Sequence, residues 1–256
     1  MIFCKTWSEL RTMDRANRVV LDVLFRLKEK VVPGVTTLEL DQMAEEWTRK
    51  AGAQPAFKGY RGYAHALCAS PNDVIVHGIP SRAPLREGDI LGLDYGVLFD
   101  GFYGDAAMTV PVGRIAAEAR RLMEVTERSL QLAIQETRLG NRVQDIGWAV
   151  QRHAEENGYS VVIDFTGHGI GRRLHEDPQV PNYGKPGFGE KLEEGMVLAI
   201  EPMVCVGSSE VSVDDDQWTA RTHDGSLSAH FERSVALTPE GPWILGESPP
   251  PGGARL

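Results

Sequence analysis

Three aspartates, at positions 94, 100 and 105, interrupt the apolar and aromatic run LDYGVLFDGFYGD. Asp100 and the glycine after it separate two alternating segments, which predicts a two-residue β-hairpin turn. In that hairpin Asp94 lies opposite Ala107. Because side chains alternate between the faces of a strand, Asp94 and Asp105 share one face as diagonal neighbours. Two such carboxylates repel each other unless a cation lies between them, so the hairpin predicts either a cation site or two solvated aspartates.

The acidic pair recurs in the second half of the chain. LREGDILGLD, which ends at Asp94, resembles LEEGMVLAIE, which ends at Glu201, 107 positions later. YGDAAMTV, which contains Asp105, aligns with HFERSVAL, which contains Glu232, across 20 additional residues. An internal repeat of this kind predicts two structurally equivalent halves.

If the halves pack about a pseudo-twofold axis, their four carboxylates converge and carry a charge of about −4 in a cleft, which is costly without counter-charge. Two divalent cations would cancel that charge. Oxygen ligands with a single imidazole and no thiolate suit Mn, Fe(II), Co or a catalytic Zn. Paired metals of this kind activate water for hydrolysis.

Each candidate also has an alternative when it is taken singly. Glu201, before a proline, could be a turn residue, and Glu232 could pair with the arginine that follows it. His77 and His168, each in a His-Gly-Ile tripeptide, could be loop histidines, and His175 with the next glutamate could form a surface pair. Recurrence of the acidic and histidine positions in the same order in both halves favours one shared site.

The elements that position these residues also repeat, as two helices followed by strands. Gly34 and Gly52 bracket one predicted helix as Gly140 and Gly158 bracket another, both 106 positions later. Apolar spacing, capping residues and glycine stops set the expected boundaries. We expect a helix after an N-cap at Ser8, a helix from Thr36 (capping box with Glu39) to Gly52, strands over 64–110, helices over 116–137 and 143–157, and strands from 160.

Composition limits the class of protein. The chain has 256 residues, of which 42% are hydrophobic, so it can bury a large core. We expect one domain over 1–247, with halves at 8–112 and 113–245, and a disordered tail at 248–256.

The cysteine spacing and the net charge limit the expected cellular compartment and the expected class of partner. The three cysteines have no CxxC spacing, which favours a reducing compartment. No signal peptide or membrane-spanning run is apparent, so we expect a cytoplasmic protein without a membrane partner. The net charge of −9 disfavours nucleic acid as a partner.

Five motifs together carry a family resemblance: VIVHGIP, LDYGVLFDGFYGD, FTGHGIGRRLHEDPQV, LAIEPMV and SAHFERSVALT. In this order they resemble the motifs of the type I methionine aminopeptidases, over roughly residues 8–245. The resemblance implies an α+β "pita-bread" fold, with two pseudo-symmetric halves, a curved antiparallel sheet and helices on one face.

The resemblance also implies metal-binding roles for the four acidic residues and for His168. Asp94 would chelate one metal ion, Asp105 and Glu232 would bridge two, and His168 and Glu201 would complete the other. Glu201 would also act as general base. The cofactor would be two divalent ions, of Co, Mn, Fe(II) or Zn.

Two further histidines and an apolar pocket match the family at other positions. His77 and His175 would hold the scissile amide and stabilise its oxyanion without binding metal. The methionine side chain would lie among aromatic residues and a thiol, which suit a thioether. These residues are Phe57, Tyr60, Tyr63, Cys68 and Trp218.

The implied activity is removal of the N-terminal methionine from peptides and nascent proteins when the next residue is small. We expect a monomer, with transient contact with the ribosome as an open possibility. Leu174 and His230 depart from the commonest family pattern, where an aromatic and a glutamine are frequent, so they bear on substrate range.

Two rival functions remain. A proline-specific peptidase or creatinase-like hydrolase of the same fold would carry an additional N-terminal domain, for which a first ligand at residue 94 leaves no room. A non-enzymatic binding module would be expected to have lost ligands, whereas all five candidates are present.

Overall fold

The computed structural model describes residues 1–247, so the tail expected at 248–256 lies outside the described residues. The helices are α1 (Trp7–Lys28), α2 (Thr37–Lys50), α3 (Ala117–Glu136) and α4 (Val143–Glu156), with a short 3-10 turn η1 (Tyr60–Gly62). The strands are β1 (Gln54–Pro55), β2 (Leu67–Pro71), β3 (Val74–Val76), β4 (Ile90–Phe99), β5 (Phe102–Pro111), β6 (Ser160–Val161), β7 (Thr166–Gly169), β8 (Glu176–Pro181), β9 (Val197–Ile200), β10 (Met203–Cys205), β11 (Val211–Val213), β12 (Ala220–Thr222), β13 (Ser228–His230), β14 (Glu232–Thr238) and β15 (Gly241–Ile244).

The main sheet is antiparallel and symmetric about its centre. Its strands run in the order β1-β4-β5-β14-β9-β7-β8, with β2 beside β4 and β15 beside β14. The series β2-β4-β5 in one half therefore mirrors β7-β9-β14 in the other, and the two halves meet where β5 pairs with β14. This is the arrangement that the repeated acidic motifs predict.

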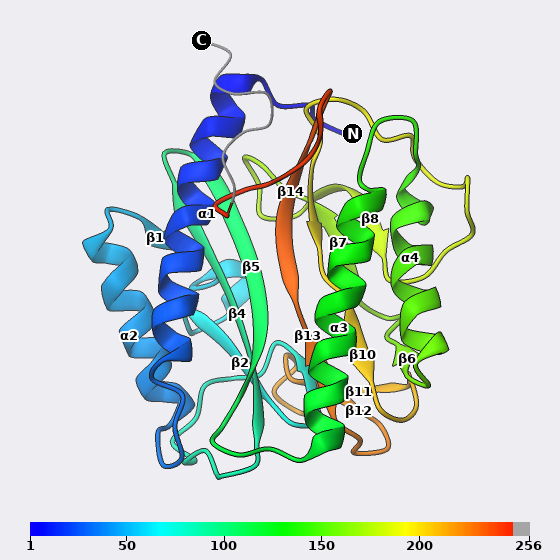
Figure 1. Ribbon diagram of the computed structural model, residues 1–256. Coiled ribbons are helices and arrows are strands. Elements are labelled where there is room, and N and C mark those ends of the chain that lie inside the picture. The colour runs from blue at the N-terminus through cyan, green and yellow to red at the C-terminus, as the bar shows by residue number, and fades with distance from the viewer. Residues whose placement is uncertain (248–256) are drawn as a thin grey trace.

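The four long helices cover one face of this sheet (Figure 1). Val20 and Leu24 of α1, Leu93 of β4 and Leu122 of α3 are among the fully buried side chains of the core between these layers. None of the helices within residues 1–247 is long and apolar enough to cross a membrane.

The start of α1 differs from the expectation of an N-cap at Ser8. Thr6 is the N-cap: its hydroxyl accepts from the Glu9 backbone N–H, and the Glu9 carboxylate accepts from the Thr6 N–H. The physical reason is the T-x-x-E spacing of a capping box, which Ser8 lacks because Arg11 stands three residues after it. The Thr36 cap of α2 is confirmed.

The predicted hairpin is confirmed in register. Asp94 pairs with Ala107 and Asp105 with Gly96 across β4 and β5. The turn residues Asp100 and Gly101 both have positive φ, at 51° and 79°, as a two-residue turn matched to strand twist requires. The two carboxylates therefore lie on one face of the sheet.

Candidate active site

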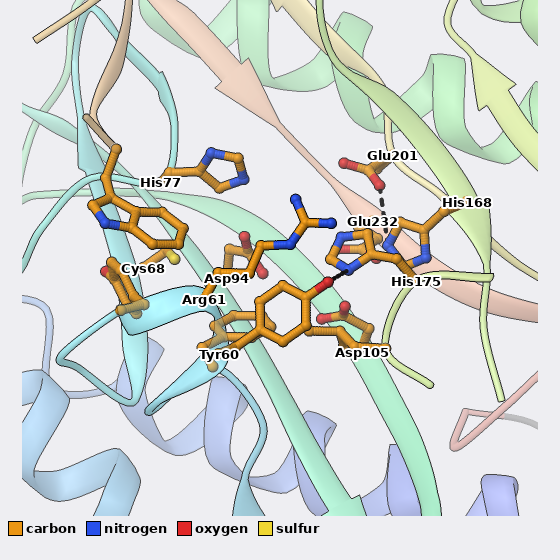
Figure 2. Close-up of a pocket in the computed structure, with 14 residues that line it drawn as sticks. Tyr60, Arg61, Cys68, His77, Asp94, Asp105, His168, His175, Glu201 and Glu232 are labelled. Atoms are coloured by element: carbon orange, nitrogen blue, oxygen red, sulfur yellow. Dashed lines mark hydrogen bonds and ion pairs between the residues drawn. The ribbon is translucent and has the colours of Figure 1, made fainter. Parts of the chain in front are cut away.

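One cavity lies on the sheet face opposite the helices, and all twelve site residues predicted from the sequence line it (Figure 2). Arg61 and Leu174 complete the lining. The twelve are Phe57, Tyr60, Tyr63, Cys68, His77, Asp94, Asp105, His168, His175, Glu201, Trp218 and Glu232.

Sheet register explains why the acidic residues converge. Asp94 of β4 and Glu232 of β14 both pair with Ala107 of β5, so they flank that residue on adjacent strands. Asp105 lies two positions along β5 and shares the same face. Glu201 follows the last residue of β9, which pairs with β14 next to Glu232. The central strands of both halves thus contribute one or more carboxylates.

His168 joins the cluster from β7 with a defined tautomer. Its Nδ1 lies 2.9 Å from the backbone carbonyl of Gly169, which can only accept, so Nδ1 carries the proton. Nε2 is left with a lone pair and lies 3.6 Å from Glu201 Oε1. Burial lowers the pKa of His168 to about 3, so the ring is neutral. A neutral imidazole with a free nitrogen is a metal ligand.

The cluster has the donor set of a divalent metal site. One ligand atom each from Asp105, His168 and Glu232 lies within 4.8 Å of the others. Asp94 Oδ1, Asp105 Oδ1 and Glu232 Oε1 are buried without a hydrogen-bond partner within residues 1–247. Buried anionic oxygens without donors are strongly unfavourable unless a cation binds them. The residues therefore fit divalent metal ions.

Burial and mutual repulsion raise the pKa of every carboxyl in the cluster. Burial raises the pKa of Asp94 to about 7. The pKa of Asp105 is raised first by burial and then by Glu232 and the other carboxylates. Burial, followed by neighbouring charge, also raises the pKa values of Glu201 and Glu232. Without metal ions, the protonated forms of these carboxyl groups are therefore favoured over the charged forms.

This arrangement predicts that the metal-free protein loses stability as the pH rises. Asp94 ionises near pH 3.8 when unfolded and near 7 when folded, so the folded state binds more protons between these values. Its contribution to the free energy of unfolding therefore falls by about 1.4 kcal/mol per pH unit across that window. The Tm of chelator-treated protein, measured from pH 5 to 8, should decline, and added Mn²⁺ should reverse the decline. Asp94→Asn should flatten the curve, whereas an equal decline in wild type and variant would contradict the assignment.

Two other histidines flank the cluster without belonging to it. The Tyr60 hydroxyl lies 2.9 Å from His175 Nδ1, and the His175 ring centroid lies 4.1 Å from that of His168. His77 packs edge-on against Trp218, with ring centroids 6.3 Å apart, and burial lowers its pKa to about 4. The pKa of His175 is lowered by desolvation and then by Arg61. Both rings are thus neutral and can each donate one hydrogen bond.

An apolar wall lies beside these groups. Phe57, Tyr63 and Cys68 are buried, and Tyr63 meets Trp218 edge to face with ring centroids 4.9 Å apart. Leu174, one of the two departures noted above, is 2% exposed and also lines the cavity. The wall is therefore apolar and carries no charged side chain.

The structure also supplies supporting contacts that the sequence did not indicate. Asp41 of α2 accepts from the backbone N–H groups of Ala66 and Leu67, which fixes the start of β2 next to Cys68. The interpretation of His175 and Glu176 as a surface pair is wrong, because Glu176 is buried and pairs with Lys5 at 2.8 Å. These partners lie 25 to 171 residues apart, so no local motif could have revealed them.

Comparison with known proteins gives the family. Residues 11–239 match metallopeptidase family M24. The chain is 51% identical to the methionine aminopeptidase of Clostridium perfringens over 96% of this chain and 98% of that protein. It is 47% identical to methionine aminopeptidase 1 of Bacillus subtilis, over 96% of this chain and 99% of that protein.

Solved structures agree with this result. The crystal structure of methionine aminopeptidase from Thermotoga maritima matches with a TM-score of 0.95 at 43% identity, covering 97% of this chain and all of that chain (100%). Prolidase from Pyrococcus furiosus matches with a TM-score of 0.76 at 21% identity, over 96% of this chain and 66% of that one, and shares the fold alone. The chain therefore belongs to metallopeptidase family M24, with the methionine aminopeptidases as its relatives, and has their α+β pita-bread fold.

Proposed function

We propose that the protein is a divalent-metal-dependent aminopeptidase that removes N-terminal methionine from peptides and nascent proteins when the next residue is small. The observation that carries this proposal is one cavity with two unlike walls. One wall is a buried carboxylate cluster with a neutral histidine, and the other is aromatic and uncharged. Membership of metallopeptidase family M24 supports it, as do the relatives named methionine aminopeptidase to which the chain is 51% and 47% identical.

Two metal ions would be held by the five ligand candidates. These candidates are Asp94, Asp105, His168, Glu201 and Glu232. Four carboxylates match the charge of two divalent ions. When bound, such ions lower the pKa of a water molecule and polarise a carbonyl oxygen. Their identity is proposed only as Co, Mn, Fe(II) or Zn, because oxygen-rich ligand sets accept all four.

The protein's own groups would carry the proton and orient the peptide. Glu201, whose carboxylate faces His168 Nε2 and His230 Nε2 at 3.6 and 3.8 Å, would take a proton from water and deliver it to the leaving amine. His175 and His77 would donate hydrogen bonds to the scissile amide and its developing oxyanion. Tyr60 would hold the His175 ring in place.

The apolar wall would select the terminal residue. A methionine thioether is unbranched and polarisable, so it suits the space beside Phe57, Cys68 and Trp218. The free α-amine would lie against the carboxylate cluster, which restricts cleavage to the chain terminus. We also propose that the protein acts as a monomer in the cytoplasm, with contact with the ribosome as a transient partner interaction.

Release of free methionine tests this function against the proline-specific alternative. Met-Ala-Ser should be cleaved, acetyl-Met-Ala-Ser should not, and Met-Leu-Ser should be cleaved more than about tenfold more slowly, because a small pocket rejects added bulk. X-Pro peptides serve as the competing substrates. Faster cleavage of X-Pro than of Met-Ala-Ser would overturn the proposal in favour of a proline-specific peptidase. Absence of any hydrolysis in the presence of Mn²⁺ or Co²⁺ would favour a binding module.

A further inference from the structure

Arg61 occupies a constrained position at the cavity. It lies between Gly59 and Gly62 in a tight loop, where Gly59 N–H donates to the Tyr63 carbonyl at 2.7 Å and Tyr63 N–H donates to the Tyr60 carbonyl at 2.9 Å. Arg61 itself has φ 48° and ψ 25°, in the left-handed region that non-glycine residues rarely adopt. Such strain persists only when the surrounding structure imposes it, and it is concentrated at functional sites.

The loop directs the Arg61 side chain into the cavity. Figure 2 shows its guanidinium between the rings of His77 and His175 in the view into the cavity. The guanidinium carbon lies 5.4 Å from the centroid of the Tyr60 ring. The pKa of His175 is lowered mainly by burial and, to a lesser extent, by the charge of Arg61. The group therefore lies where a peptide would pass over the Tyr60–His175 pair.

Among the residues within 1–247 that line the cavity, Arg61 is the one arginine or lysine. Some exposed arginines outside the cavity pair with carboxylates, as Arg15 does with Asp100 and Arg172 with Glu9. For the Arg61 guanidinium, the described part of the chain shows only the stacking contact with Tyr60. A cation with no ion-pair partner at the mouth of a substrate cavity is available to a group on the substrate.

The substrate's direction follows from the proposed function, on which this inference rests. With methionine against Phe57 and Cys68 and the scissile amide at the carboxylate cluster, the residues after the small second residue leave past Tyr60 and Arg61. Two divalent ions would cancel the charge of the four carboxylates. The positive charge of Arg61 would then be the main charge along the path by which the peptide leaves the cavity.

We propose that Arg61 is a specificity-determining residue that favours peptides with an acidic side chain at the third position, following methionine and the small residue. A guanidinium binds a carboxylate through two parallel hydrogen bonds. Because Arg61 is exposed to solvent, the preference is modest, about three- to fivefold in kcat/KM at low ionic strength. It weakens at high ionic strength because salt screens exposed charges.

A matched pair of substrates isolates the charge. The amidated peptides Met-Ala-Asp-NH2 and Met-Ala-Asn-NH2 have the same shape and differ by one negative charge, and Met-Ala-Lys-NH2 reverses the sign. The ratio of kcat/KM for Asp over Asn is independent of the amount of active enzyme. It should be about three to five for wild type, close to one for Arg61→Gln, and intermediate for Arg61→Lys, which keeps the charge but not the planar fork. In about 0.5 M NaCl the wild-type ratio should fall towards one.

Free-acid peptides distinguish the side-chain carboxylate from the terminal one. A preference for Met-Ala-Asn with a free C-terminus, without a preference for Asp over Asn among the amides, would overturn recognition of the third side chain. A wild-type Asp/Asn ratio of one, or an unchanged ratio in Arg61→Gln, would also overturn the role of Arg61. In those cases methionine would still be released, so the proposed function would stand. If none of these peptides releases methionine, the result would instead count against the proposed function itself.

Discussion

Chelation of divalent metal ions is expected to abolish methionine release, and Asp105→Asn is expected to be nearly as damaging. Asp105 is 4% exposed, and its Oδ1 has no hydrogen-bond partner within the described chain. An asparagine keeps the shape but offers one neutral oxygen where a carboxylate offers two charged ones. We expect kcat/KM to fall well beyond the roughly 100-fold that follows loss of a group supporting a metal ligand.

The measurement is kcat/KM for Met-Ala-Ser together with bound metal per protein by elemental analysis. Asp100→Asn is the matched control, because it makes the same chemical change in the same hairpin. Asp100 lies in the turn with its side chain 68% exposed, and asparagine also tolerates its positive φ. Asp100→Asn should therefore retain activity and metal. Full activity after chelation, or in Asp105→Asn, would exclude the metal-dependent mechanism.

Asp105→Asn should also separate catalysis from folding. Burial and three neighbouring carboxylates raise the pKa of Asp105, so its charge destabilises the metal-free fold. A neutral amide removes that repulsion. The variant's Tm in chelator should therefore equal or exceed that of wild type at pH 8, even though its activity is lost.

Much of this site could be predicted because its residues lie in a local hairpin pattern or in an internal sequence repeat. The alternation of a β-hairpin fixes Asp94 and Asp105 on one face once the turn is recognised. The internal repeat then extends that pair to Glu201 and Glu232, and register with Ala107 confirms the geometry. The T-x-x-E rule is equally local and identifies Thr6, so the expectation of an N-cap at Ser8 is wrong.

The supporting contacts could not be predicted because they join distant segments. The buried Lys5–Glu176 pair and the Asp41 contacts with the start of β2 depend on how whole elements pack. The direction of the Arg61 side chain depends on a left-handed backbone angle, which sequence does not specify for an arginine. The roles of His77 and His175 follow from the family resemblance and are predictions.

Replacement of His175 with alanine is expected to lower kcat by about 10²- to 10³-fold while leaving the metal ions bound. The ring is outside the ligand cluster: its Nδ1 faces the Tyr60 hydroxyl, and its neutral state leaves one N–H to donate to substrate. Loss of one hydrogen bond to a developing oxyanion has this order of effect. Because that interaction strengthens only in the transition state, KM should change much less than kcat.

His168→Ala provides the contrasting control for the His175 variant, since the two rings lie 4.1 Å apart and have the same chemistry. His168 holds a buried lone pair towards Glu201, so its loss should reduce metal content as well as kcat. Tyr60→Phe tests the intermediate step, because it keeps the stacked ring and removes only the hydroxyl near His175. It should lower kcat by less than His175→Ala does. If His175→Ala loses metal as His168→Ala does, then His175 is a ligand, and the oxyanion role must be assigned to His77 alone.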